Sequence, residues 1–442
     1  MSRRTPRLTA PIAAAALVGA GLAVLPATSA GAATTTVRTE SQLRSALQRA
    51  NDVDGEDTIR LGRSIALRRG QLEITDSLVL DGNGHALVAR SKDRILDITA
   101  DTTVRVQDVT LRGGRAPEGE SGGAIRATDA TVRVVDSRLV GNRALGEGAS
   151  GGAIMNDAGS VTVTGSRLEK NRAERAGGGI EANAGLTTVT DSVLRGNRTG
   201  AAPGNGGGLH LTGPGSVVVE QSKVLRNRAS SEGGGLWNSA DGQMTVTDTV
   251  LRGNVARGAE ATMGGGALFN DGGTLAVEGA TITGNRATGT AGSGGGVLND
   301  QGLLSMNTSV LSKNRAPRAG GGIETNLGTV DLADVDLLDN RTGDMPGNGG
   351  GLHLTGMAQV TYDGGTVTGN DASAQGGGLW NSDTGLLFVM GVEVTGNTAP
   401  EGPDVYNDGG LFLQDGVPVP PNSLPGLDGL PGLDGLPGLP LP

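Results

Sequence analysis

The segment Gly233-Gly-Gly-Leu-Trp-Asn-Ser239 returns unchanged as residues 376–382, which lie 143 positions further along the chain. It belongs to a series of Gly-Gly pairs whose second glycines occupy positions 123, 152, 178, 207, 234, 266, 295, 321, 350 and 377. The successive steps of 29, 26, 29 and 27 residues occur twice, separated by one step of 32. A block of five repeats has therefore been duplicated in tandem, as residues 115–257 and 258–400.

Every repeat, about 28 residues long, has the same internal order. A short apolar segment such as 236–238 follows the glycines, an alternating segment such as 244–248 follows a Gly/Asp turn, and a third segment ends in Gly-Asn. Alternation of β-branched residues indicates strands, whereas Gly, Asn and Asp indicate turns. Three short strands per repeat predict an all-β, single-stranded parallel β-helix whose coils stack about 4.8 Å apart.

One asparagine per repeat occupies the same turn. An inward-facing asparagine can bond backbone groups that the strands leave open, and stacked amides can bond one another. We therefore predict a structural asparagine ladder, not a ligand site, formed by Asn142, Asn171, Asn197, Asn227, Asn254, Asn285, Asn314, Asn340, Asn370 and Asn397. The arginine that commonly follows is expected to be a solvated turn residue.

These motifs resemble a known group of proteins. Gly-Gly-Ala-Ile and Gly-Gly-Gly-Leu, followed about 20 residues later by Gly-Asn-Arg-Ala, resemble the repeats of secreted right-handed parallel β-helix proteins, including polymorphic outer-membrane proteins. Residues 41–51 resemble the CSLREA segment that opens many such proteins, with Ser41 in place of its cysteine. The resemblance covers roughly residues 34–415 and implies the right-handed pectin-lyase-like fold. It leaves the activity open, because that fold serves lyases, hydrolases, adhesins and surface proteins.

The two ends of the chain differ from the repeats. Residues 1–33 combine early arginines, an apolar stretch and Ala30-Gly-Ala32, which predicts an export signal and a secreted, extracellular or cell-surface protein. Residues 34–115 are expected to hold the first coils and, from a capping-box pattern at 39–42, a short helix that covers the open end. The repeats then span 116–415, and the Pro/Gly/Leu-rich residues 416–442 predict a disordered or extended tail.

The composition excludes several classes of function. The chain has 442 residues, of which 79 are glycine, 7 are aromatic and none is cysteine, so it contains no disulfide, thiolate metal site or cysteine nucleophile. The net charge of -10 becomes -13 without the three arginines of the export signal, which indicates no basic patch for nucleic acid or anionic lipid. We expect a monomer without a membrane span, cofactor or metal, with a polysaccharide or cell-envelope glycan as its partner.

One register position gathers most of the chemistry. If the leucine of Gly-Gly-Gly-Leu points inward, the next residue points outward. That outward position holds Arg126, Met155, Glu181, His210, Trp237, Phe269, Leu298, Glu324, His353, Trp380 and Tyr406. Two interpretations are open: the aromatic members Trp237, Phe269, Trp380 and Tyr406 stack sugar rings in a groove, or long turns bury the column and the side chains only stabilise the sheet.

An enzyme is the alternative. Glu181 beside His210, and Glu324 beside His353, are candidate acid–base pairs. The two glutamates cannot form one glycosidase pair, because five coils separate them by about 24 Å and such a pair needs roughly 5 to 10 Å. Repetition suits multivalent binding better than catalysis. The sequence thus favours a non-catalytic surface for polysaccharide or envelope binding over a polysaccharide lyase or glycoside hydrolase, with a structural envelope protein as a further alternative.

Overall fold

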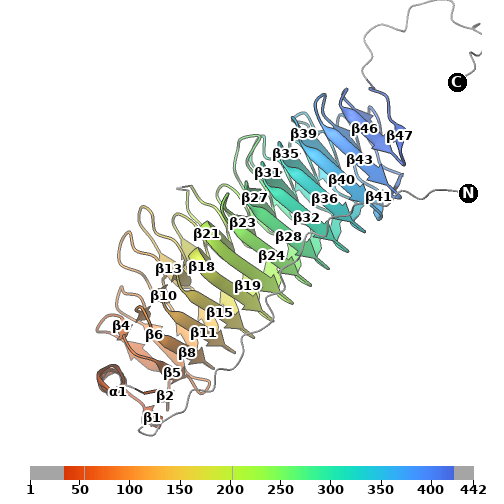
Figure 1. Cartoon of the computed structure of the whole chain (residues 1–442). Helices are drawn as coiled ribbons and strands as arrows, with labels where there is room; N and C mark the ends of the chain where they lie inside the picture. Colours follow the sequence, from red (N-terminus) through yellow and green to blue (C-terminus); the bar gives the residue numbers. More distant parts are fainter. Residues whose placement is uncertain (1–33, 54, 202, 423–442) are drawn as a thin grey trace, which may run out of the picture.

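The computed structural model describes residues 34–53, 55–201 and 203–422, and these form one elongated right-handed β-helix of about 14 turns (Figure 1). The predicted fold class is confirmed. The predicted export signal, residues 1–33, and the end of the predicted tail, residues 423–442, lie outside the described residues.

Each coil contributes two strands to a 27-stranded sheet and one to a 13-stranded sheet. In several coils a two-residue strand joins one of two small sheets, which have three and four strands. The first strands of the large sheet are β4 (Leu72–Ile74), β7 (Leu96–Ile98), β10 (Ile125–Thr128), β14 (Ile154–Asp157), β18 (Ile180–Thr190), β21 (Leu209–Glu220), β23 (Leu236–Asn238), β27 (Leu268–Asp271), β31 (Val297–Asp300), β35 (Ile323–Asn326), β39 (Leu352–Thr355), β42 (Leu379–Asn381) and β45 (Val405–Asn407).

Strands β18 and β21 continue through the following turn, so they also serve as second strands. The other second strands are β1 (Thr34–Val37), β2 (Asp57–Leu61), β5 (Leu78–Asp81), β8 (Thr103–Gln107), β11 (Thr131–Val135), β15 (Ser160–Thr164), β24 (Gln243–Thr247), β28 (Thr274–Glu278), β32 (Leu303–Asn307), β36 (Thr329–Ala333), β40 (Gln359–Asp363), β43 (Leu386–Met390) and β46 (Leu411–Gln414).

The 13-stranded sheet comprises β3 (Ile65–Leu67), β6 (Ala86–Ala89), β9 (Thr110–Arg112), β12 (Arg138–Val140), β16 (Arg167–Glu169), β19 (Val193–Arg195), β22 (Lys223–Leu225), β25 (Val250–Arg252), β29 (Thr281–Thr283), β33 (Val310–Ser312), β37 (Asp336–Leu338), β41 (Thr366–Thr368) and β44 (Glu393–Thr395). The two-residue strands are β13 (Arg143–Ala144), β17 (Arg172–Ala173), β20 (Arg198–Thr199), β26 (Val255–Ala256), β30 (Arg286–Ala287), β34 (Arg315–Ala316) and β38 (Arg341–Thr342).

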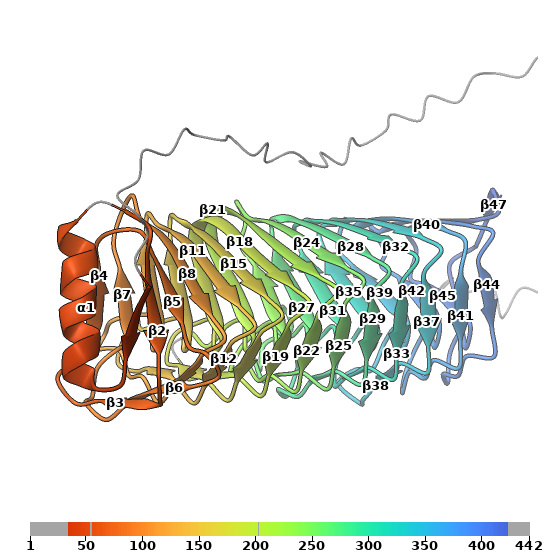
Figure 2. The same cartoon turned by 90° about the horizontal axis from the view of Figure 1, so that it is seen from below.

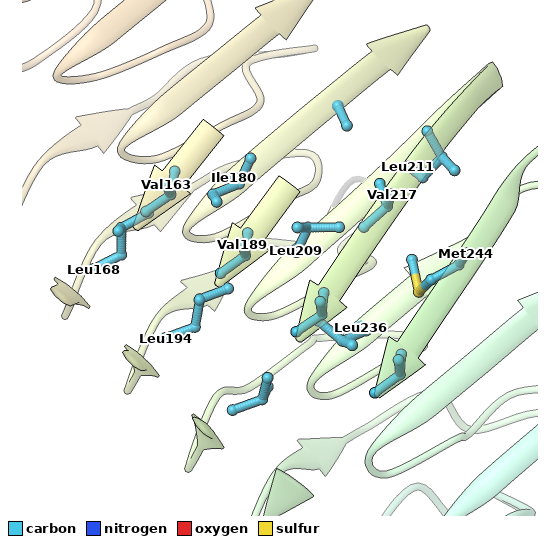
Figure 3. Packing of buried hydrophobic residues seen from close by; sticks show 14 of the residues in the cluster. Val163, Leu168, Ile180, Val189, Leu194, Leu209, Leu211, Val217, Leu236 and Met244 are labelled. Atoms are coloured by element: carbon cyan, nitrogen blue, oxygen red, sulfur yellow. The ribbon is translucent and has the colours of Figure 1, made fainter. Parts of the chain in front are cut away.

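The core is a column of aliphatic side chains. Alternate residues of each strand point inward, and Val163, Leu168 and Val189 in successive strands are fully buried (Figure 3). Parallel pairing repeats this pattern coil after coil, since Val161 and Val163 pair with Thr187 and Val189 on the next strand. Burial of such side chains supplies most of the favourable free energy of folding.

The Gly-Gly signature follows from close packing between coils. At Gly206 the backbone has φ of +61°, a left-handed conformation that favours glycine. At Gly207 an added Cβ would lie 2.4 Å from the carbonyl oxygen of Gly234 in the next coil. The first glycine therefore turns the chain, and the second lets the adjacent coil approach.

Both ends of the rod are covered. Helix α1 (Glu40–Asp52) lies across the first coil (Figure 2). The Thr39 hydroxyl accepts a hydrogen bond from the backbone N of Gln42, as the capping box predicted. The Gln42 side chain accepts one from the backbone N of Arg38, the residue before the N-cap, instead of from Thr39 itself. The buried face of α1 consists of the predicted residues Leu43, Ala46, Leu47 and Ala50.

At the other end, β47 (Val417–Pro418) pairs antiparallel with β46, and Val419 packs against the core. The Asn422 side chain accepts a hydrogen bond from the backbone N of Asn407. Residues 416–422, which their composition assigned to the tail, thus cover the last coil. A proline in such an edge strand costs no ladder hydrogen bond.

Candidate functional site

The structure places the predicted column in register along the large sheet. Glu181 pairs with His210, His210 with Trp237, and Trp237 with Phe269 on successive strands. The second block repeats this order, since Glu324 pairs with His353, His353 with Trp380, and Trp380 with Tyr406. Arg126 and Met155 precede the first set, and Leu298 lies between the two sets.

The column lies outside the central core, but the turns cover it. Trp237 and Trp380 are each 8% exposed, Tyr406 is 5% exposed and Phe269 is 2% exposed. The covering turn contains Gly233, a glycine with left-handed backbone conformation four residues before Trp237. A Cβ added at Gly233 would lie 2.8 Å from the Trp237 Cβ, so the turn packs against this side chain. The structure agrees with the second interpretation, in which turns bury the column. The four aromatic side chains therefore form no open groove.

Aromatic rings stack along the column. The ring of His210 lies 4.2 Å from that of Trp237 at an interplanar angle of 14°, and His353 and Trp380 repeat both values. Phe269 follows Trp237 at 6.2 Å and 7°. Stacked pairs of this kind add about 0.5 to 1.5 kcal/mol beyond the area that they bury.

A buried carboxylate orients each histidine. Nδ1 of His210 lies 3.1 Å from Oε1 of Glu181, and the Thr212 hydroxyl donates to the same oxygen at 2.6 Å. Arg175 adds an ion pair at 3.5 Å, and both Glu181 and His210 are almost completely buried. The arrangement fixes the imidazole against the carboxylate, and the 1% exposure of Glu181 and 3% exposure of His210 keep both groups away from solvent.

The second block reproduces this constellation. Nδ1 of His353 lies 2.9 Å from Oε2 of Glu324, and the Thr355 hydroxyl donates to Oε1 of Glu324 at 2.7 Å. Arg318 forms an ion pair with Glu324 at 3.4 Å. The two units are separate, so they share no reacting atom.

A titratable group that sequence reasoning missed joins the first unit. Nε1 of Trp237 donates to Oε2 of Glu232 at 3.1 Å. Burial raises the pKa of Glu232 to about 7, and the negative charges of Asp271 and Asp300 also raise it. At the corresponding place of the second block, Trp380 donates instead to the uncharged Gln375. Among the described residues, no group of three or more His, Cys, Asp or Glu is arranged to hold a metal ion.

The predicted asparagines form a continuous hydrogen-bonded ladder. Nδ2 of Asn142 donates to Oδ1 of Asn171, Asn171 donates likewise to Asn197, and the series runs on to Asn397. From Asn171 onward, each Oδ1 also accepts the backbone N–H of the preceding ladder residue, and Oδ1 of Asn142 accepts the backbone N–H of Gly114. A second ladder, from Asn238 through Asn270 to Asn299, was not predicted. Its signal is the asparagine two residues after the inward leucine, which lies in the first strand of its coil.

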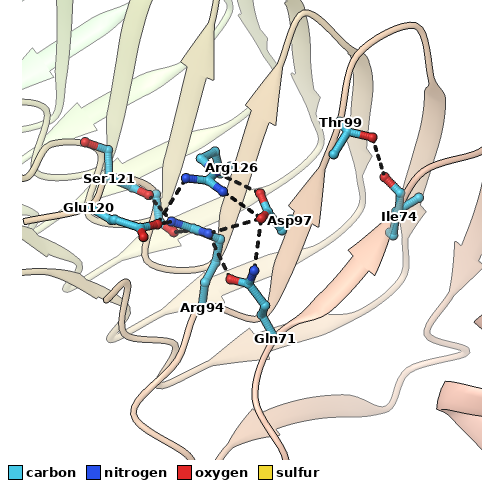
Figure 4. A network of polar contacts seen from close by, with 9 residues as sticks. Gln71, Ile74, Arg94, Asp97, Thr99, Glu120, Ser121 and Arg126 are labelled. Atoms are coloured by element: carbon cyan, nitrogen blue, oxygen red, sulfur yellow. Dashed lines mark hydrogen bonds and ion pairs between the residues drawn. The ribbon is translucent and has the colours of Figure 1, made fainter. Parts of the chain in front are cut away.

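A further polar site lies beside the helical cap. A cleft of about 780 Å³ between α1 and the first coils is lined by charged residues including Arg44, Asp93 and Arg126. Behind it, the fully buried guanidinium of Arg94 bonds Gln71, Glu120 and the backbone of residues 121 and 122 (Figure 4). Asp97 accepts two hydrogen bonds from Arg126. These groups satisfy one another and brace the first coils.

The stacked coils and the asparagine ladder that repeats along them define a parallel β-helix solenoid. The family model described as "Right handed beta helix region" matches residues 64–302, more than half of the chain, so the protein belongs to the right-handed β-helix family. No curated protein matches the chain. In the part of the chain that the structure describes, no helix is long and apolar enough to cross a membrane.

Proposed function

We propose that the protein is an exported, non-catalytic β-helix rod whose long sides bind polysaccharide or cell-envelope glycan. The observation that carries this proposal is that the conspicuous Glu–His–Trp units are sealed inside the turns. They serve the stability of the rod and leave its lateral surface as the part that can meet a partner. A stack of similar coils presents the same chemistry at a regular spacing, which suits a repeating polymer.

Catalysis is the second candidate, and the buried contact between Glu181 and His210 is the observation that favours it. A general base must lie within hydrogen-bonding reach of the substrate proton. For this pair, the covering turn would first have to move, because Glu181 is 1% exposed and His210 is 3% exposed.

The test uses the chain without residues 1–33. Co-sedimentation with purified bacterial envelope and with insoluble polysaccharides measures binding, and release of new reducing ends or unsaturated products measures turnover. We expect binding without turnover, and we expect Trp237→Phe and Trp380→Phe to bind as the parent does, because both tryptophans are buried. If the protein binds none of the preparations, a structural role in the envelope remains as the alternative function. Turnover that His210→Ala and His353→Ala together abolish, in a folded variant, would establish an enzyme.

A further inference from the structure

The two duplicated blocks differ sharply in charge. Residues 115–257 contain 16 Lys or Arg and 14 Asp or Glu, whereas residues 258–400 contain 5 and 14. The acidic count has stayed the same while most basic positions differ. The strongly negative net charge of the chain therefore conceals a first block that is close to neutral and rich in cations.

Five of the eleven additional cations lie on one face. In β12, β16, β19, β22 and β25 the central residue of each strand is fully buried, so the flanking residues point outward. We call the cationic side chains among them the basic face: Arg138, Arg167, Arg195, Lys223 and Arg252. The corresponding strands of the second block, β29, β33, β37, β41 and β44, carry no Lys or Arg.

A row of arginines adjoins the basic face across the asparagine turn. Arg143 pairs with Arg172, Arg172 with Arg198, and Arg198 with Arg228, one per coil. Neighbours in this row are therefore about 4.8 Å apart at the backbone. Like charges at that spacing repel each other, so the row gains from a polyanion that replaces its counterions.

Few of these cations are neutralised within the chain. Arg138 forms an ion pair with Glu169 at 2.7 Å, and Arg172 forms one with Glu174 at 3.2 Å. Within residues 34–53, 55–201 and 203–422, the side chains of Arg167, Arg195 and Lys223 have no ion pair, and all three are exposed. The expectation that the chain has no basic patch is thus wrong, because net charge averages over a segregated surface.

We propose that the basic face and its adjoining arginine row bind a linear anionic glycan that runs along the rod. This inference rests on the proposed function and names the chemical class of its ligand. Arginine suits carboxylate, sulfate or phosphate groups because its fork donates two parallel hydrogen bonds. Single-stranded nucleic acid is disfavoured, since such sites combine cations with exposed aromatic rings for base stacking, and Trp237 and Trp380 are buried.

The second block supplies a matched design for the test. Arg167→Val, Arg195→Leu and Lys223→Thr together install the residues found at 310, 338 and 366, which already fit equivalent coils. The control, Arg60→Thr with Arg105→Thr and Arg133→Thr, removes the same charge from exposed positions of β2, β8 and β11 in the large sheet, away from the basic face and the arginine row. Binding of heparin, hyaluronan, uncharged dextran and single-stranded DNA is measured at about 50 and 200 mM salt.

We expect the parent to bind heparin and hyaluronan, with affinity that falls as salt rises, and not to bind dextran. The first triple variant should lose about tenfold in affinity, and the control should lose clearly less. Equal losses in both variants, or tighter binding of DNA than of either glycan, would overturn the proposal. If the parent sediments with envelope and the first variant does so undiminished, the basic face is excluded while the proposed function stands. If the parent binds neither envelope nor glycan, both are wrong.

Discussion

Removal of one rung of the asparagine ladder should destabilise the rod well beyond an ordinary surface substitution. Oδ1 of Asn227 accepts hydrogen bonds from the backbone N and from Nδ2 of Asn197, at 2.9 and 3.1 Å. Its Nδ2 donates to the Leu194 carbonyl and to Asn254, at 2.9 and 3.1 Å. The substitution Asn227→Ala deletes all four bonds inside a region that excludes water.

The expected cost follows from what is left unpaired. The backbone N–H of Asn197 loses its side-chain acceptor, and a buried donor without a partner costs about 1 to 3 kcal/mol. Nδ2 of Asn197 keeps its bond to the Leu168 carbonyl, so its loss is partial. Together with the lost hydrogen bond to the Leu194 carbonyl, we expect Asn227→Ala to lower the free energy of unfolding by about 2 to 4 kcal/mol.

Urea unfolding followed by circular dichroism measures this change, and hydrogen exchange read by mass spectrometry locates it. Because coils contact mainly their neighbours, faster exchange should be confined to the coils around residue 227. Arg228→Ala is the matched control, since its side chain is exposed and its loss should change stability by less than about 0.5 kcal/mol. An equally small effect of Asn227→Ala would refute the reasoning that the ladder stabilises the turns.

Three further substitutions test the covered column. Trp237→Ala should cost about 3 to 5 kcal/mol in urea unfolding, because it empties a buried stack; a loss below about 1 kcal/mol would mean that the turn collapses onto the space. Gly206→Ala should lower the melting temperature more than Gly213→Ala, since both have positive φ but only the former meets atoms of its own coil; equal losses would leave backbone conformation as the sole cause. Glu232 has a folded-state pKa raised to about 7 by burial, so the stability that its protonated form provides is present below the unfolded pKa of about 4.3 and is lost as pH rises through 7. Glu232→Gln installs the residue found at 375 in the second block. It should therefore stabilise the protein at pH 8 by about 1 to 3 kcal/mol and leave its stability unchanged near pH 4. The same dependence of unfolding free energy on pH in variant and parent would contradict this.

The sequence was most informative where a signal recurs in every coil. The Gly-Gly spacing gave the length of each coil, and the asparagine in every Gly-Asn turn predicted the ladder that runs from Asn142 to Asn397. The capping helix was also predicted, because Leu43 and Ala46 fall on one face of a local amphipathic pattern. These features depend on local periodicity and on contacts between equivalent residues, both of which a repeat displays directly.

The covered column shows where this reasoning ended. Its register was predicted, but its exposure depended on the path of the turn before each strand, and glycine alone does not fix that path. Gly233 permits a left-handed turn, yet only the folded chain shows that the turn lies against Trp237. Glu232, brought by the same turn to within 3.1 Å of the indole nitrogen, was invisible for the same reason.

The sequence by itself determined that the chain repeats, that it winds as a β-helix and that one column collects two of its three histidines and both tryptophans. The tertiary structure decided which surfaces meet solvent: turns seal the aromatic column, while the cations of Arg167, Arg195 and Lys223 converge on an open face. The physical reason is that periodicity specifies which residues are neighbours. Exposure and electrostatic field depend instead on every segment that folds over or beside them.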